Sequence, residues 1–172
     1  ILANHLGRHR VTPNVKAACL CATPFNLAPG AKALQTGFTQ VYELRFLFSL
    51  RRKAKAKAKK HPQGQQWIRQ TLKAKTLEAF DHYWTAPSFG FESSADYYQK
   101  ASSAPHISNI SVPTYVLHAQ NDPIVVDDCF PGTQLEQNPN IEVDILPFGG
   151  HMGFWEQEPN WLAERMLQFL NA

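Results

Sequence analysis

Residues 113–123 read PTYVLHAQNDP, and this stretch decides the fold. Its first half, Pro113 to His118, is a short apolar run that predicts a buried strand. Its second half, Ala119 to Pro123, has the composition of a turn, since proline pre-sets the backbone after Asp122. In open α/β sheets the working groups gather beyond the carboxyl ends of the strands. Asp122 is therefore a candidate functional residue.

A second strand with a polar residue beyond it follows along the chain. Residues 141–146 alternate between apolar and polar side chains, and the next eight residues, 147–154, read PFGGHMGF. The glycines beside His151 let this loop turn sharply and give the imidazole room to reach a neighbour. Asp122 and His151 are 29 residues apart but only one connection apart in topology. We therefore expect the fold to bring them side by side.

A carboxylate beside an imidazole has a specific chemistry. The neutral ring takes a proton from a hydroxyl and later returns it to a leaving group, while the carboxylate orients the ring and stabilises the imidazolium. The alternatives are a plain turn residue at Asp122 and a surface side chain at His151. The other histidines show no metal-ligand spacing, which predicts that the chain has no metal site. These are His5, His9, His61, His82, His106 and His118.

The elements around these two strands complete an α/β order. Val15 to Ala22 is an apolar run that predicts a third buried, parallel strand. Ile1 to Leu6 resembles the tail of a helix closed by Gly7, and Glu158-Pro159 is expected to open a final helix. Strands separated by helices and loops in this order predict a mostly parallel sheet.

Between the first and second strands lies a helical excursion, which we interpret as a cap inserted into the sheet domain. We predict long helices over 38–60 and 66–83, a loop over 84–91 and a short helix capped by Ser93 or Ser94. The expected domains are a first part of the core at 1–35, the cap at 36–105 and the rest of the core at 106–172. Four cap aromatics either line an acyl pocket or pack in the cap core: Tyr83, Trp84, Phe89 and Phe91.

The cap carries an unusual concentration of positive charge. Residues 44–77 hold eleven Lys or Arg and no Asp or Glu, whereas the whole chain has a net charge of only +3. The tract RRKAKAKAKK at 51–60 is expected to be helical, because Lys and Ala are both strong helix formers. We favour a solvated face of the cap, and the alternative is peripheral contact with a membrane surface or another anionic ligand. Nucleic acid is not expected, since the tract contains no aromatic residues.

The three cysteines indicate a reducing compartment. Cys19, Cys21 and Cys129 form neither a CxxC pair nor an even disulfide framework, so buried packing is the favoured interpretation. No apolar run is long enough to span a membrane, and no signal peptide is visible. We predict a cytoplasmic protein, with membrane association through the basic helix as the alternative.

Four blocks of this sequence resemble one known family. HAQNDP at 118–123 and GGHMGF at 149–154 are similar to the acid and histidine blocks of α/β-hydrolases of the YheT-like branch, also called the AB hydrolase 4 family. FDHYWTAPSFGF at 80–91 and ADYYQKASSAP at 95–105 agree with it. The resemblance implies an α/β-hydrolase sheet with a cap, and a Ser-His-Asp triad with Asp122 as acid and His151 as base. It also implies carboxylic ester substrates, including short acyl esters and acylglycerols, with no metal or organic cofactor. Asn121 departs from relatives that carry a second acid there.

The serine of that triad is the part this sequence does not supply. In this fold the serine lies in a G-x-S-x-G elbow before the acid, and no serine of the chain has that glycine frame. ILANHLGRH at 1–9 resembles the helix that follows the elbow in the family. We therefore expect the chain to be the C-terminal part of a hydrolase, starting just after the elbow.

Three expectations follow from the missing serine. The isolated chain should be essentially inactive. The strand at 15–22 should be left with an unpaired edge, which favours poor solubility. The alternative function is a non-catalytic remnant, or a membrane-surface module that uses residues 51–60.

Overall fold

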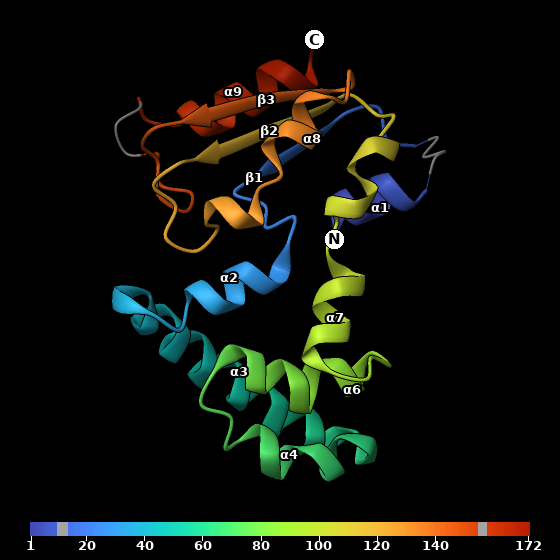
Figure 1. The fold of residues 1–172 in the computed structure, drawn as a ribbon, viewed down its shortest axis with the longest axis vertical. Helices are drawn as coiled ribbons and strands as arrows, with labels where there is room; N and C mark the ends of the chain where they lie inside the picture. Colours follow the sequence, from blue (N-terminus) through green and yellow to red (C-terminus); the bar gives the residue numbers. More distant parts are fainter. Residues whose placement is uncertain (10–13, 155–157) are drawn as a thin grey trace. The chain divides into compact units, whose positions relative to one another are not determined.

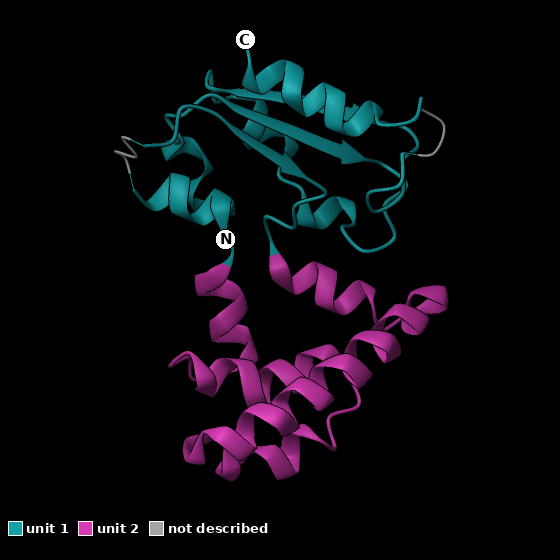
Figure 2. Ribbon diagram, turned by 180° about the vertical axis from the view of Figure 1, so that it is seen from behind, with its two compact units in different colours: residues 1–26, 102–172 teal, residues 27–101 magenta. Residues whose placement is uncertain are grey.

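The computed structural model describes residues 1–9, 14–154 and 158–172. The chain divides into two compact units, shown in different colours in Figure 2. Unit 1 combines Ile1–Asn26 with Ser102–Ala172, and unit 2 is Leu27–Ala101. Each unit is described by itself below.

Unit 1 is built on a parallel sheet of three strands. The strands are β1 (Ala18–Cys21), β2 (Thr114–Ala119) and β3 (Ile141–Leu146), in the order β1-β2-β3. Both pairings are parallel, and the register places Ala18 opposite Thr114 and Ala119 opposite Leu146. The central strand β2 is buried along its whole length, as the apolar run at 113–118 predicted. Figure 1 shows the three strands running side by side. This is the α/β architecture expected from the sequence.

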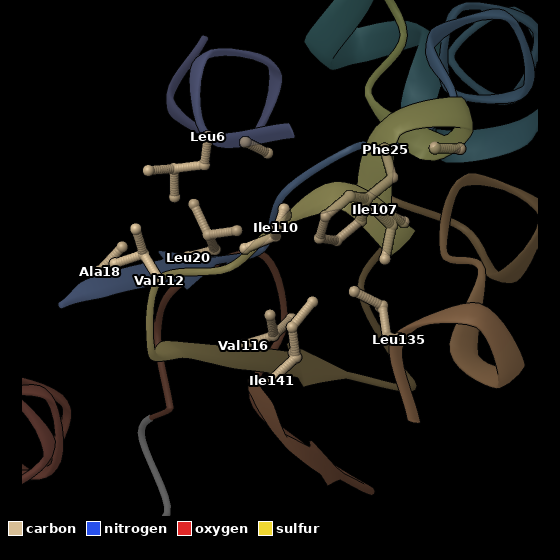
Figure 3. Packing of buried hydrophobic residues seen from close by; sticks show 12 residues of the cluster. Leu6, Ala18, Leu20, Phe25, Ile107, Ile110, Val112, Val116, Leu135 and Ile141 are labelled. Carbon is tan, nitrogen blue, oxygen red and sulfur yellow. The ribbon is translucent and has the colours of Figure 1, made fainter. Parts of the chain in front are cut away.

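One face of the sheet packs against α1 (Leu2–Arg8), the 3-10 helix η4 (Ala104–Asn109) and α8 (Gly132–Glu136). Figure 3 shows this cluster, in which Leu6, Ile107 and Leu135 come from the helices and Val116 from β2. Burying such side chains contributes about 1.5–3 kcal/mol each. Gly7 lies inside α1 rather than closing it, since α1 continues to Arg8. A Cβ at this position would lie 2.4 Å from the backbone oxygen of His106, so glycine allows the close approach of α1 to η4.

The opposite face of the sheet packs against α9 (Trp161–Leu170). The side chains that meet there are Tyr115, Leu117 and Ala119 from β2 with Trp161, Leu162 and Phe169 from α9. Arg165 fixes α9 further, because its guanidinium lies 2.8 Å from Asp144 on β3 and its Nε donates to the hydroxyl of Tyr115 at 3.2 Å. Cys19 and Cys21 lie on this face of β1. The final helix is therefore present, and it begins at Trp161.

All regular secondary structure in unit 2 is helical. Its elements are α2 (Leu27–Ala33), η1 (Gly37–Thr39), α3 (Gln40–Lys60), η2 (Pro62–Gly64), α4 (Gln65–Thr71), α5 (Leu77–Phe80), a π-helical turn (Asp81–Thr85), α6 (Ala86–Ser88) and α7 (Ser94–Ala101). Ser93 caps α7 by accepting a hydrogen bond from the Asp96 amide at 3.1 Å. It is one of the two serines predicted for this cap. Unit 2 covers most of the predicted cap at residues 36–105, and its role as a cap stays a prediction.

The lysine-alanine tract is helical, as predicted, and two of its alanines are buried while its lysines are exposed. Ala54 and Ala58, one helical turn apart, are buried in the core of unit 2, while the lysines of the tract are exposed. Trp84 belongs to the same core and meets Trp67 edge-on, with ring centroids 6.3 Å apart. Of the two roles expected for Trp84, lining an acyl pocket or packing in the cap core, the structure supports packing in the core.

Two predictions for unit 2 were wrong. The single helix over 66–83 is interrupted after Thr71, because the buried carboxylate of Glu43 accepts the Leu77 amide at 2.7 Å and Thr76 caps a new helix there. The loop over 84–91 is helical in its first half. Its π-helical turn is held by Asp81, which accepts hydrogen bonds from the hydroxyls of Thr85 at 2.6 Å and Tyr98 at 2.8 Å.

Candidate active site

The structure brings Asp122 and His151 together at the carboxyl-terminal end of the strands β2 and β3. Ala119 and Leu146 are partners at the ends of β2 and β3, so the two following loops leave the sheet at the same place. Nδ1 of His151 lies 2.9 Å from Oδ2 of Asp122, which is hydrogen-bond distance. The Asp122 side chain is fully buried, whereas 41% of the His151 side chain is exposed. A buried carboxylate thus holds an imidazole that still reaches solvent.

The turn after β2 fixes the carboxylate of Asp122. Its Oδ1 accepts hydrogen bonds from the amides of Ile124 at 2.8 Å and Val125 at 3.0 Å. The Asp122 amide in turn donates to the carbonyl of Ala119 at 3.1 Å. With one oxygen held by the backbone, the other is aimed at His151.

Asn121 joins the acid loop to the histidine loop. Its Oδ1 accepts hydrogen bonds from the amides of Gly149 at 3.0 Å and Gly150 at 2.8 Å. The sequence interpretation assigned no role to this residue. The signal was its place in the turn beside Asp122, because Asn side chains readily bond backbone amides in turns. Asn121 thus sets the loop that carries His151.

Each glycine before His151 has its own physical reason. A Cβ at Gly149 would lie 2.5 Å from the ring of Phe154 and 2.9 Å from Cβ of Ala119, so only glycine fits. Gly150 has free space around it but a φ of +57°, a conformation that glycine adopts without strain. Phe154 itself has a φ of +46° and is buried. Strained backbone of this kind gathers at functional sites.

The electrostatics of the pair favour an ionised acid and a basic imidazole. Burial raises the pKa of the Asp122 carboxyl, but the hydrogen bonds from His151, Val125 and Ile124 outweigh it, and the pKa lies below its ordinary value. The hydrogen bond to Asp122 raises the pKa of His151, against the opposing effect of burial. With its proton on Nδ1 toward the carboxylate, neutral His151 presents Nε2 as the proton acceptor.

Two other reactive side chains close to this edge are unsuited to the chemistry. Burial raises the pKa of the Cys21 thiol to about 11, with a smaller contribution from the Asp122 charge, so the thiol stays protonated. His118 is buried and stacked on Phe130, with ring centroids 4.5 Å apart. Neither of its nitrogens has a hydrogen-bond partner in the described ranges, and burial lowers its pKa.

The described residues contain no candidate metal site. Within residues 1–9, 14–154 and 158–172, no three His, Cys, Asp or Glu side chains group closely enough to hold a metal ion.

Comparison with known proteins gives this geometry a context. The chain is 30% identical over 178 residues to a monoacylglycerol lipase of Saccharomyces cerevisiae, an alignment covering 99% of the chain and 39% of that protein. It is 30% identical over 141 residues to the putative esterase YheT of Escherichia coli, covering 81% of the chain and 41% of that protein. The mouse phospholipase ABHD3 is 27% identical over 179 residues, covering all of the chain and 43% of its own length. No family model matches the chain.

The chain belongs to the α/β-hydrolase superfamily. It falls in the YheT-like branch, as the four sequence blocks indicated, and it matches the C-terminal region of longer proteins. The chain spans about two fifths of the length of these relatives. Within this α/β-hydrolase the parallel sheet places Asp122 and His151 in contact, and their catalytic role stays a prediction.

Proposed function

We propose that the protein containing this chain hydrolyses carboxylic esters, acylglycerols among them, through a Ser-His-Asp triad. The observation that carries the proposal is the 2.9 Å contact between Nδ1 of His151 and the buried carboxylate of Asp122, at the ends of adjacent parallel strands. Relatives named as a lipase, an esterase and a phospholipase support the substrate class.

The residues of this chain have defined roles in that reaction. Nε2 of His151 takes the proton from the serine hydroxyl as it attacks the ester carbonyl, and the same proton then passes to the leaving alcohol. A water molecule then attacks the acyl-serine while His151 takes its proton. The carboxylic acid is released, and the proton returns to the serine oxygen. Asp122 keeps the proton of His151 on Nδ1 and stabilises the imidazolium in each step.

Labelling with a fluorophosphonate probe tests the proposal in the full-length protein. The probe reacts covalently with an activated serine, and mass spectrometry of the labelled peptide identifies that serine. We expect His151→Ala to lower the labelling rate and ester turnover by on the order of 10⁴-fold or more, and Asp122→Asn by on the order of 10⁴-fold. Ser108→Ala is a matched control, because Ser108 has neither glycine of the nucleophile frame, and the variant should label normally.

The opposite outcome is equally specific. If His151→Ala labels and turns over at the wild-type rate, the triad assignment is wrong. For the 172-residue chain alone, which has no serine in a G-x-S-x-G frame, we propose hydrolysis no faster than the uncatalysed background. Saturable ester hydrolysis by that chain would contradict this.

A further inference from the structure

Helix α3 carries a continuous exposed stripe that is apolar at one end and basic at the other. At 3.6 residues per turn, six residues of the stripe fall on one side of the helix. These residues, called here the α3 outer stripe, are Val41, Leu44, Phe48, Arg52, Lys55 and Lys59. All six are exposed. A different side of α3, between a quarter and a third of a turn around the helix, is buried in unit 2 through Leu47, Ala54 and Ala58.

The apolar end of the stripe is strongly exposed. The exposed fractions are 56% for Val41, 65% for Leu44 and 72% for Phe48. Single exposed apolar residues are ordinary on protein surfaces, but three at spacings of three and four on one helix form a contiguous patch. Patches of this kind mark interaction sites. The sequence interpretation as a solvated face accounts for the lysines but not for these three side chains.

The basic end of the stripe carries no compensating acid. Glu43 is the only acidic residue of α3, and it is buried with its carboxylate bound to the Leu77 amide at 2.7 Å. Residues 44–77 add eleven Lys or Arg and no Asp or Glu. The partner that fits therefore offers dense negative charge beside an apolar phase.

We propose that the α3 outer stripe binds the surface of membranes that contain anionic lipids. The helix would lie in the interface, with Val41, Leu44 and Phe48 entering the acyl boundary and Arg52, Lys55 and Lys59 binding lipid headgroups. From Val41 to Lys59 the stripe is about 27 Å long at 1.5 Å per residue, so both ends reach one flat surface together. No helix in the described ranges has the length and apolarity of a membrane span. The proposal does not rest on the hydrolase chemistry, since binding needs no turnover.

Sedimentation with lipid vesicles tests the proposal on the intact protein. Vesicles of phosphatidylcholine alone are compared with vesicles holding about 30% phosphatidylserine, at salt concentrations from about 50 to about 200 mM. We expect binding to the anionic vesicles only, falling steeply with salt. Replacing Arg52, Lys55 and Lys59 together by Gln should weaken binding about 100-fold, from about five-fold per charge.

A matched triple variant separates the stripe from general charge. Lys53, Lys57 and Lys60 are also exposed and lie about a third of a turn around α3 from the basic end of the stripe. Replacing these three by Gln removes the same charge and should weaken binding less than about 10-fold. Phe48→Ser should weaken it about 10-fold with an unchanged salt dependence, because it removes apolar burial rather than charge. All seven positions are exposed, and circular dichroism spectra verify that each variant keeps its helix content.

Several results would overturn the proposal. They are equal binding to both kinds of vesicle, equal losses in the two triple variants, or no loss in Phe48→Ser. Binding to a single-stranded oligonucleotide without binding to vesicles would assign the basic tract to nucleic acid instead. His151→Ala should bind vesicles like the wild type, so failure of the triad assignment and failure of this proposal remain distinguishable.

Discussion

At the scale of single residues, Asn121 determines how His151 is presented. Its side-chain oxygen holds the amides of both glycines that precede His151, while the neighbouring Asp122 holds the ring. Two loops that follow different strands are thus joined twice. An acid at position 121 could accept the same amides, but it would add a negative charge beside the pair.

Substitutions at Asn121 separate these two effects. Asn121→Ala removes two exposed hydrogen bonds and should lower the free energy of unfolding by about 1 kcal/mol, measured by urea denaturation of the chain. Asn121→Asp keeps an acceptor and adds a charge, so it should raise the pKa of His151 above the wild-type value. Titration of the His151 ring by NMR measures that pKa without any catalytic turnover.

The sign of the pH dependence follows from the raised pKa of His151. Because the folded state binds this proton more tightly than the unfolded state, the extra stability is fully present below the unfolded pKa of about 6.5 and is lost as pH rises through the folded pKa. If His151 is the base of the proposed triad, it must be neutral to act, so the activity of the full-length protein should rise with pH through the same folded pKa. Asn121→Asp should move that rise to higher pH. An unchanged His151 pKa in Asn121→Asp would show that position 121 does not influence the pair.

The sequence predicted that Asp122 and His151 lie side by side. It did not predict the contacts that hold their loops in place, and the reason is physical. Asp122 and His151 each stand just beyond a strand with a readable apolar pattern, so local rules located them. The tie from Asn121 depends on amides 28 and 29 residues away, and the close fit of Gly149 depends on the ring of Phe154. Contacts of this kind exist only once the chain is folded. Local composition therefore indicates that a loop turns, but not what holds it.

At the scale of elements, the same distinction explains the two wrong predictions in unit 2. The break between α4 and α5 is stabilised by Glu43, 34 residues earlier in the chain, and the π-helical turn by Tyr98, 17 residues after Asp81. Residues 66–83 contain no Gly or Pro that would break a helix, and the interruption depends on tertiary hydrogen bonds that helix propensity does not include. Helix α3 was predicted correctly because propensity and packing agree along it.

The lysine-alanine tract of α3 gives a sharp test at this scale. Ala58 is buried, and its Cα would lie 3.3 Å from a Cβ added at Gly64, so this contact between α3 and η2 is tight. Ala58→Leu should therefore lower the free energy of unfolding by about 1–3 kcal/mol through overpacking. Ala56→Leu, two residues away and exposed, should change it by less than about 0.5 kcal/mol. Thermal and urea unfolding followed by circular dichroism measure both. Equal effects would mean that the tract does not pack through Ala58.

At the scale of the whole molecule, charge separates by unit more sharply than the net value suggests. Unit 2 holds thirteen Lys or Arg and five Asp or Glu, whereas unit 1 holds four and nine. The net charge of +3 is thus the balance of a basic helical unit and an acidic sheet unit. A surface with this distribution presents a strong local field even where the average charge vanishes.

Ion-exchange chromatography near the isoelectric point tests this consequence. At about pH 8.8, where the sequence predicts no net charge, the excess of Lys and Arg in unit 2 should still bind the chain to a sulfonate cation exchanger. Replacing Lys53 and Lys60 by Gln should lower the salt concentration needed for elution. Replacing the exposed Arg8 and Lys16 of unit 1 by Gln removes the same charge and should have a clearly smaller effect, because these residues lie outside the basic unit. Equal shifts for the two double variants would show that retention follows the net charge alone, and the basic unit would then not act as a distinct binding surface.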